Sequence, residues 1–80
     1  MRWILYSRNE CPLCEYAANI LRALKMEFIE VDVDACDALT SRYGAQVPVI
    51  RDAHHKRELG FPFEPVDVAE FVGADTGEPL

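Results

Sequence analysis

Apolar residues recur along the chain with two different spacings, and the changes between them divide the sequence into strands and helices. A short apolar run such as Trp3–Tyr6 is typical of a buried strand, whereas the three- and four-residue spacing after Cys11 is typical of one helical face. The predicted elements, in order, are a strand over 3–6, a helix from 11 or 12 to 24, a strand over 28–33, a helix over 34–43, strands over 47–50 and 57–60, and a helix from 65 to 72.

The same patterns predict which side chains face the core and where the second helix begins and ends. Asp34 is expected to cap the start of that helix and Gly44 its end. The predicted inward-facing residues are Cys14, Ala17, Ala18, Leu21 and Leu24 in the first helix, Ile29, Val31 and Val33 in the second strand, Ala35, Leu39 and Tyr43 in the second helix, and Val68, Phe71 and Val72 in the last helix.

The order of the elements is βαβαββα, which predicts an α/β fold. A strand, a helix and a strand in succession favour parallel pairing of the first two strands. The turn-like residues 52–55 favour an antiparallel hairpin between the last two strands. With 80 residues, half of them apolar, the chain can bury one core, so we predict a single domain over 1–80 with its core at about 2–72 and a flexible tail over 73–80.

Charge and hydropathy exclude several classes of partner. The net charge of −6 disfavours nucleic acids and anionic membranes, because phosphate groups would be repelled. No apolar run approaches the roughly 20 residues that cross a bilayer, and the apolar start over residues 3–6 is too short for a signal peptide. We therefore expect a cytoplasmic, monomeric protein that binds neither nucleic acid nor membrane.

The strongest chemical signal is Cys11-Pro12-Leu13-Cys14, which opens the first predicted helix. A thiolate at a helix start is stabilised by unpaired backbone N–H groups and by the helix dipole, which lowers the pKa of such a thiol. A second thiol one turn on can attack a mixed disulfide formed on the first. In the cytoplasm such a pair indicates redox chemistry or metal binding rather than a structural disulfide.

Other interpretations of the two thiols remain open at this point. A half zinc site would need further ligands, and the candidates are Cys36 and the adjacent His54 and His55. The pair could also be an inert remnant, in which case the chain would be a binding module without turnover. A third alternative is a carrier of a metal or an iron–sulfur cluster through Cys11. Cys36 itself is expected to be a small packed residue, and the two histidines to lie in the hairpin turn.

Taken together, these motifs resemble the thioredoxin fold in its small glutaredoxin-like form, over roughly residues 2–72. The resemblance rests on C-P-x-C at a helix start, on a valine–proline pair that opens the hairpin, and on Phe61-Pro62-Phe63. It implies a four-stranded mixed sheet flanked by three helices. It also implies a thiol–disulfide oxidoreductase that uses Cys11 as the exposed nucleophile and Cys14 as the buried resolving thiol to reduce protein or glutathione mixed disulfides.

Three further residues receive roles from this resemblance. Pro48 would be cis and would face the dithiol, and the backbone of Val47 before it would contact an extended substrate. Arg8 stands where many glutaredoxins place a lysine that favours the thiolate and the carboxylate of glutathione. No cofactor would be bound permanently, and glutathione is a candidate reductant.

The sequence also departs from the usual glutaredoxin pattern. Leu13 replaces an aromatic residue, Gln46 replaces a threonine, and residues 58–63 stand where a Gly-Gly segment binds the γ-glutamyl end of glutathione. Phe61 and Phe63 in that segment are expected to cover the end of the sheet. The alternative is that they form an apolar platform for a protein substrate.

Overall fold

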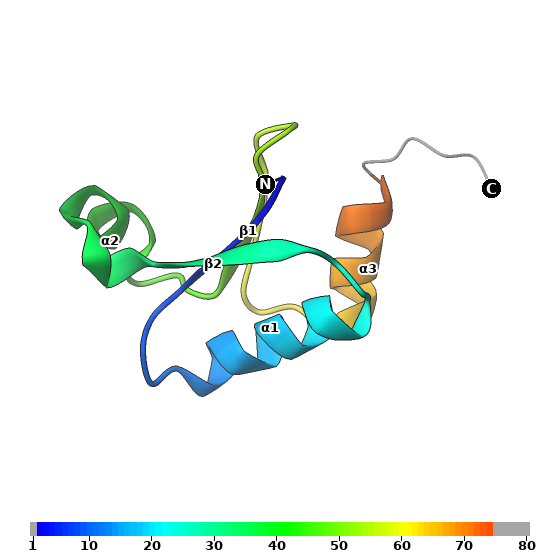
Figure 1. Cartoon of the computed structure of the whole chain (residues 1–80), viewed down its shortest axis with the longest axis horizontal. Helices are drawn as coiled ribbons and strands as arrows, with labels where there is room; N and C mark the ends of the chain where they lie inside the picture. Colours follow the sequence, from blue (N-terminus) through cyan, green and yellow to red (C-terminus); the bar gives the residue numbers. More distant parts are fainter. Residues whose placement is uncertain (1, 75–80) are drawn as a thin grey trace.

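The computed structural model describes residues 2–74, and in it a four-stranded sheet carries helices on both faces (Figure 1). The predicted order of strands and helices is confirmed. The elements are β1 (Trp3–Ser7), α1 (Pro12–Ala23), β2 (Phe28–Asp32), a short 3₁₀ helix η1 (Val33–Ala35), α2 (Asp37–Tyr43), β3 (Val49–Asp52), β4 (Arg57–Gly60) and α3 (Pro65–Ala74).

The strands lie in the order β2-β1-β3-β4, so β1 is central. It pairs in parallel with β2, as predicted, and antiparallel with β3, while β3 and β4 form the predicted hairpin. The mixed sheet therefore follows from the two connections: a helical crossover after β1 gives a parallel neighbour, and a tight turn after β3 gives an antiparallel one.

Alternation along β1 and β3 creates two separate hydrophobic clusters. Leu5 lies opposite Ile50 on the face covered by α1 and α3, whereas Tyr6 lies opposite Val49 on the face covered by α2. The larger cluster holds Trp3, Leu5, Ala17, Ala18, Ile20, Leu21, Ile50, Phe63 and Val68, and the smaller one holds Val33, Tyr43 and Val49 with Tyr6, Leu39 and Val47 at its margin.

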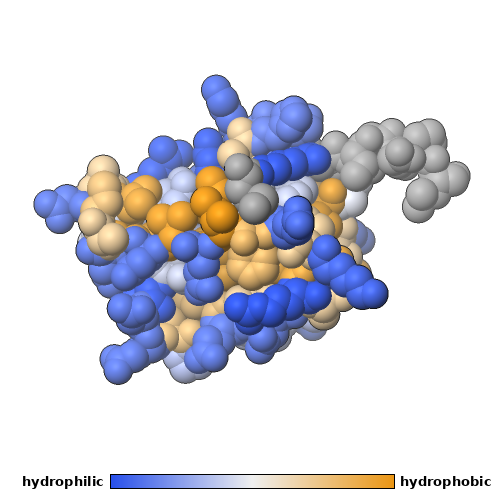
Figure 2. Space-filling view, in the orientation of Figure 1, coloured by the Kyte–Doolittle hydropathy of each residue, from blue (hydrophilic) through white to orange (hydrophobic). Residues whose placement is uncertain are grey.

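The second strand is less buried than its pattern predicts. Ile29 is 43% exposed, because β2 is an edge strand and α2 covers only the end of that face near Tyr6 and Val49. Apolar surface accordingly crosses the middle of the face in Figure 2, bordered by hydrophilic side chains. Leu24 is also exposed, because α1 ends at Ala23 and Leu24 is already its C-cap.

The second helix is shorter than predicted, and Asp34 does not cap it. The Asp32 carboxylate accepts a hydrogen bond from the Asp34 N–H (2.9 Å), which starts η1 over Val33–Ala35 and leaves Ala35 exposed rather than buried. Val33 is fully buried, as predicted, but in η1 rather than in a strand. Helix α2 begins only after Cys36, which is exposed rather than packed.

Gly44 follows α2 as its C-cap, as predicted, but in a right-handed conformation (φ −54°). Its N–H donates to the Thr40 carbonyl (2.9 Å). A Cβ atom on Gly44 would lie 2.5 Å from that carbonyl oxygen and 3.1 Å from Nη2 of Arg8. Glycine is therefore required here for close approach rather than for a left-handed turn.

Two boundaries on the carboxyl-terminal side differ from prediction. Strand β3 begins at Val49, two residues later than expected, because the preceding Val47–Pro48 peptide bond is cis and lies outside the ladder. Helix α3 continues to Ala74, past the predicted end at 72. The remainder of the predicted tail, residues 75–80, lies outside the described residues.

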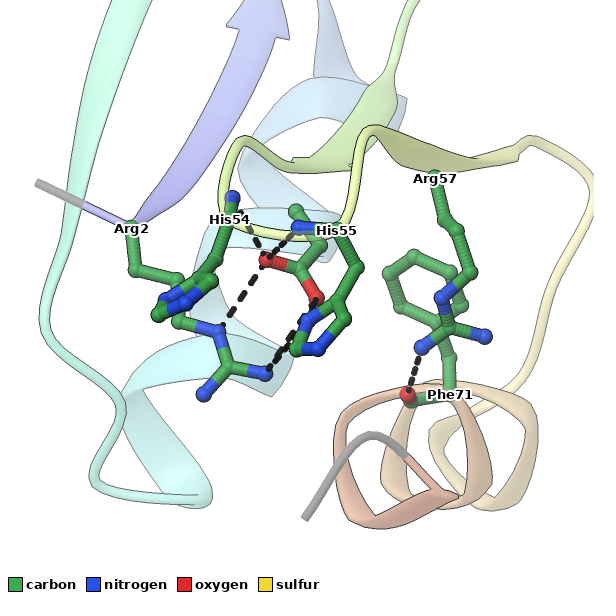
Figure 3. A network of polar contacts seen from close by, with 6 residues as sticks. Arg2, His54, His55, Arg57 and Phe71 are labelled. Atoms are coloured by element: carbon green, nitrogen blue, oxygen red, sulfur yellow. Dashed lines mark hydrogen bonds and ion pairs between the residues drawn. The ribbon is translucent and has the colours of Figure 1, made fainter. Parts of the chain in front are cut away.

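Asp52, which the sequence places in the turn-like segment 52–55, is the last residue of β3 and a buried carboxylate. Asp52 is fully buried and accepts two hydrogen bonds from the Arg2 guanidinium, at 3.1 and 3.3 Å (Figure 3). It also accepts the backbone N–H groups of His54 and His55, and lies 3.2 Å from Nδ1 of His55. Asp52 thereby joins the chain start to the hairpin turn.

We expect Asp52→Ala to lower the free energy of unfolding by about 3 kcal/mol, because it removes a fully buried carboxylate together with its hydrogen bonds to the Arg2 guanidinium and to two backbone N–H groups. Urea denaturation at neutral pH measures this. Asp37→Ala, at an exposed position in the first turn of α2, is the matched control and should cost less than about 1 kcal/mol. Equal losses in the two variants would contradict a structural role for Asp52.

Candidate active site

The residues singled out from the sequence come from loops at one end of the sheet. Strand β1 ends at Ser7, and the loop that follows leads to Cys11. Because Tyr6 pairs with Val49 in an antiparallel ladder, the residues just before β3, Val47 and Pro48, lie beside that loop. The parallel strand β2 also ends here.

The two cysteines are held by the first turn of α1. Cys11 is the N-cap and Pro12 occupies the first helical position, where its missing N–H is not needed. The sulfur atoms of Cys11 and Cys14 are joined as a disulfide, with 5.2 Å between the Cα atoms. Cys14 is 2% exposed and Cys11 is partly exposed, so only the first sulfur can be approached from solvent.

One backbone donor contacts the first sulfur, and two bond to the carbonyl of the same residue. The Cys14 N–H lies 3.2 Å from Sγ of Cys11 and also bonds to the Cys11 carbonyl (3.0 Å), which the Glu15 N–H bonds as well (3.1 Å). This is the arrangement in which a helix start stabilises a negative charge on its N-cap side chain.

The Val47–Pro48 peptide bond is cis, as the resemblance implied. Pro48 is buried, and its carbonyl accepts the Phe61 N–H (3.1 Å). The Val47 N–H donates to the Tyr43 carbonyl (3.1 Å), so this donor is already used within the protein. A second cis bond, Phe61–Pro62, was not foreseen from the sequence.

Arg8 is fully engaged in contacts with other loops. Its Nε and Nη2 bond to the two oxygens of Asp34 (2.8 and 3.0 Å), and its Nη1 donates to the Gly44 carbonyl (2.9 Å). The hydrogen bond from Arg8 is the main reason that the pKa of Asp34 is lowered, and the pKa of Arg8 is raised in return. Arg8 thus connects the loop before Cys11 to the segments after β2 and α2; whether it also stabilises a thiolate stays a prediction.

An aromatic and charged network supports the same end of the sheet and was not predicted. Tyr43 stacks on Tyr6 with 4.2 Å between ring centroids, and its hydroxyl donates to Glu58, which also pairs with Arg51 (2.7 Å). Burial, followed by the hydrogen bond to Glu58, raises the pKa of Tyr43 to about 12. Burial acts to raise the pKa of Glu58, but the hydrogen bonds from Tyr43 and Arg51 outweigh it and the pKa is lowered.

A groove of about 650 Å³ runs beside the dithiol. Pro12, Leu13 and Tyr16 of α1 form one side, and residues 61–64 with Asp67 form the other. We call this the Leu13–Phe61 groove. Phe63 is buried in the larger cluster, as expected, whereas Phe61 packs against that cluster and stays partly exposed. Both line the groove, and a platform for a protein substrate stays a prediction.

The two histidines considered as metal ligands do not lie at this site. His54 and His55 follow Asp52, which pairs with Trp3 at the far end of β1 from Cys11. Within residues 2–74, no three His, Cys, Asp or Glu side chains are grouped so that they could hold a metal ion. No helix in the described part of the chain is long and apolar enough to cross a membrane.

Comparison with known proteins places this geometry in context. The sequence matches the model of the glutaredoxin-like domain (DUF836) over residues 2–73. The crystal structure of the Northeast Structural Genomics target protein XcR50 from X. campestris is similar, with 38% identity and a TM-score of 0.83 over 90% of this chain and 96% of that one. The solution structure of the same target has 39% identity and a TM-score of 0.82 over 92% and 95%.

A further similar structure is the solution structure of protein Ne2328 from Nitrosomonas europaea. It has 31% identity and a TM-score of 0.74 over 91% of this chain and 87% of that one. A search of the curated proteins found no match.

We expect Arg8→Gln to raise the pKa of the Asp34 carboxyl toward its ordinary value, because the hydrogen bond and the charge that lower it are removed. A carboxyl NMR titration measures this. A lowered carboxyl pKa stabilises the fold above the pKa of the unfolded chain, and that stabilisation is lost as the pH falls through the folded-state value. The stability difference between the variant and the wild type should therefore be present at neutral pH and vanish in acid.

Arg42→Gln is the control for this experiment, because Arg42 approaches Glu58 (4.0 Å) rather than Asp34. An unchanged pKa of Asp34 in Arg8→Gln would contradict the pairing of Arg8 with Asp34, through which Arg8 connects the loop before Cys11 to the segment after β2.

Proposed function

Because the chain belongs to the glutaredoxin-like domain family (DUF836), we propose that it is a thiol–disulfide oxidoreductase in which Cys11 is the nucleophile and Cys14 the resolving thiol. The observation that carries the proposal is the unequal exposure of two adjacent sulfur atoms at the start of α1. Cys11 is partly exposed and its sulfur lies against the Cys14 N–H, and the buried Cys14 is close enough to form a disulfide with it.

The reaction on a substrate disulfide has two exchange steps. The Cys11 thiolate attacks one substrate sulfur, a mixed disulfide forms, and the other substrate sulfur leaves as a thiolate that takes up a proton. The Cys14 sulfur, having lost its proton, then attacks Sγ of Cys11 and releases the second substrate thiol. The substrate gains two electrons and two protons, and the protein is left with the Cys11–Cys14 disulfide.

The surroundings have supporting roles in this scheme. The Cys14 N–H and the start of α1 stabilise negative charge on Cys11. Pro48, whose nitrogen carries no proton, places an apolar ring at the end of the sheet beside the loop that leads to Cys11. The Val47 carbonyl is a backbone acceptor for an extended substrate. Arg8 holds the loop in place through Asp34 and Gly44.

The substrates in this proposal are protein disulfides or small mixed disulfides in the cytoplasm, where thiols are kept reduced. Two molecules of glutathione, or one dithiol protein of the thioredoxin type, would regenerate the reduced protein. No permanently bound cofactor is needed for these steps, and the monomer contains both reacting sulfurs.

We expect Cys14→Ser to accumulate mixed disulfides on Cys11 in cells, because the resolving thiol is absent. Non-reducing gels and mass spectrometry identify the captured partners. Cys11→Ser should capture nothing and should lower disulfide reduction by about a thousandfold or more, as expected for loss of a nucleophile.

Cys36→Ser is the matched control, because it removes an exposed thiol outside the site and should leave turnover unchanged. The proposal is wrong if Cys14→Ser captures no partner and the wild type reduces no disulfide with either reductant. A binding module without turnover would then be the better description.

A further inference from the structure

We propose that the Leu13–Phe61 groove binds a peptide segment that carries both an apolar side chain and a lysine or arginine close to its cysteine. This inference rests on the proposed function, because the cysteine of the segment would be the one in the disulfide that Cys11 attacks. It adds the class of substrate, which the dithiol alone does not specify.

The position of the groove links it to the reacting sulfur. Pro12 and Leu13, which form one side, are the two residues between Cys11 and Cys14. A peptide in the groove therefore lies against the two residues that separate the reacting cysteines. The Val47 N–H is already bonded to the Tyr43 carbonyl, so it cannot donate a hydrogen bond to the backbone of a substrate peptide. Side-chain contacts in the groove must then supply much of the recognition.

The groove is apolar and its aromatic side is held in place before a ligand arrives. Leu13 is 46% exposed. Phe61 makes edge contacts with both Tyr16 and Phe63, at 6.4 and 5.4 Å between ring centroids, and the Tyr16 hydroxyl bonds to the Phe63 carbonyl (3.4 Å). An apolar side chain of a peptide would be removed from water between Leu13 and Phe61.

The charges at the groove are all negative. Glu64 and Asp67 line it, and among the described residues no lysine or arginine does. Within residues 2–74, neither carboxylate pairs with a cationic side chain; Asp67 accepts the Glu64 N–H (2.8 Å) at the start of α3. A lysine or arginine of the peptide complements these two charges. Glutathione is anionic at neutral pH, and the groove and the net charge of −6 would repel it.

The test compares short peptides of the form Gly-Phe-Cys-Lys-Gly, each joined by a disulfide to 2-mercaptoethanol. Replacing the peptide lysine by glutamine should lower kcat/KM about two- to fivefold, as expected for one exposed ion pair, and the difference should disappear at high salt. Replacing the peptide phenylalanine by glycine should lower kcat/KM about tenfold, because the buried apolar area is lost.

Two pairs of variants locate these preferences on the protein. Glu64→Gln should lower the ratio between the lysine and glutamine peptides, because one of the two carboxylates of the groove is removed. Glu70→Gln, at an exposed position of α3 outside the groove, should leave that ratio unchanged. Leu13→Gln should reduce the preference for phenylalanine over glycine, whereas Leu24→Gln, at the far end of α1, should not.

A binding assay separates this inference from the proposed function. The double variant Cys11→Ser/Cys14→Ser lacks both thiols of the site, and fluorescence anisotropy measures its affinity for labelled Gly-Phe-Ser-Lys-Gly, which contains no thiol. Binding that weakens in Glu64→Gln and Leu13→Gln backgrounds supports the groove even if the wild type reduces no disulfide. Equal reduction of all peptides, unaffected by these variants, overturns the groove and leaves the redox function standing. A preference for acidic peptides or for oxidised glutathione also overturns it.

Discussion

The antiparallel register between β1 and β3 is the constraint on which the candidate site depends. With Tyr6 opposite Val49, the cis Val47–Pro48 bond must lie at the end of the sheet where the chain leaves β1 for Cys11. The same register places Asp52 opposite Trp3, at the other end. A shift of one residue would turn every side chain of β3 to the opposite face, exposing Ile50 and burying Arg51. Core packing and site geometry are therefore maintained by the same pairing.

Arginines flank the central strand and connect it to segments distant in sequence. Arg2, just before β1, holds the buried Asp52 at the end of β3. Arg8, just after β1, holds Asp34 and the Gly44 carbonyl. The two contacts differ in kind: Asp52 is fully buried, so losing its partner is costly, whereas the exposed pair with Asp34 serves chiefly to position a loop. The guanidinium suits both, because its donors form a planar fork that bonds two oxygens together.

The reactive and selective parts of the site depend on different features. In the proposed reaction, charge on Cys11 would be stabilised by the start of α1 and the Cys14 N–H, which any sequence with that turn would supply. The proposed selectivity would depend on particular side chains around it, above all on Leu13 and on Phe61, where the chain departs from the usual glutaredoxin pattern. Both residues line the groove of about 650 Å³, whose walls are mostly apolar and which also carries acidic side chains.

The sequence by itself determined the order of elements, the parallel pairing of β1 with β2, the β3–β4 hairpin, and the placement of Cys11 and Cys14 at a helix start. These follow from local periodicity, from the lengths of the connections and from the preference of Pro12 for the first turn of a helix. The antiparallel pairing of β1 with β3 was decided by the tertiary structure. Only the tertiary structure decided that Ile29 is exposed, that Asp34 pairs with Arg8 instead of capping α2, and that Asp52 is buried beneath Arg2. These outcomes depend on which distant element covers a face or supplies a partner charge. The local pattern of apolar and polar residues does not specify these partners, because they are brought together only when the strands pair and the helices pack.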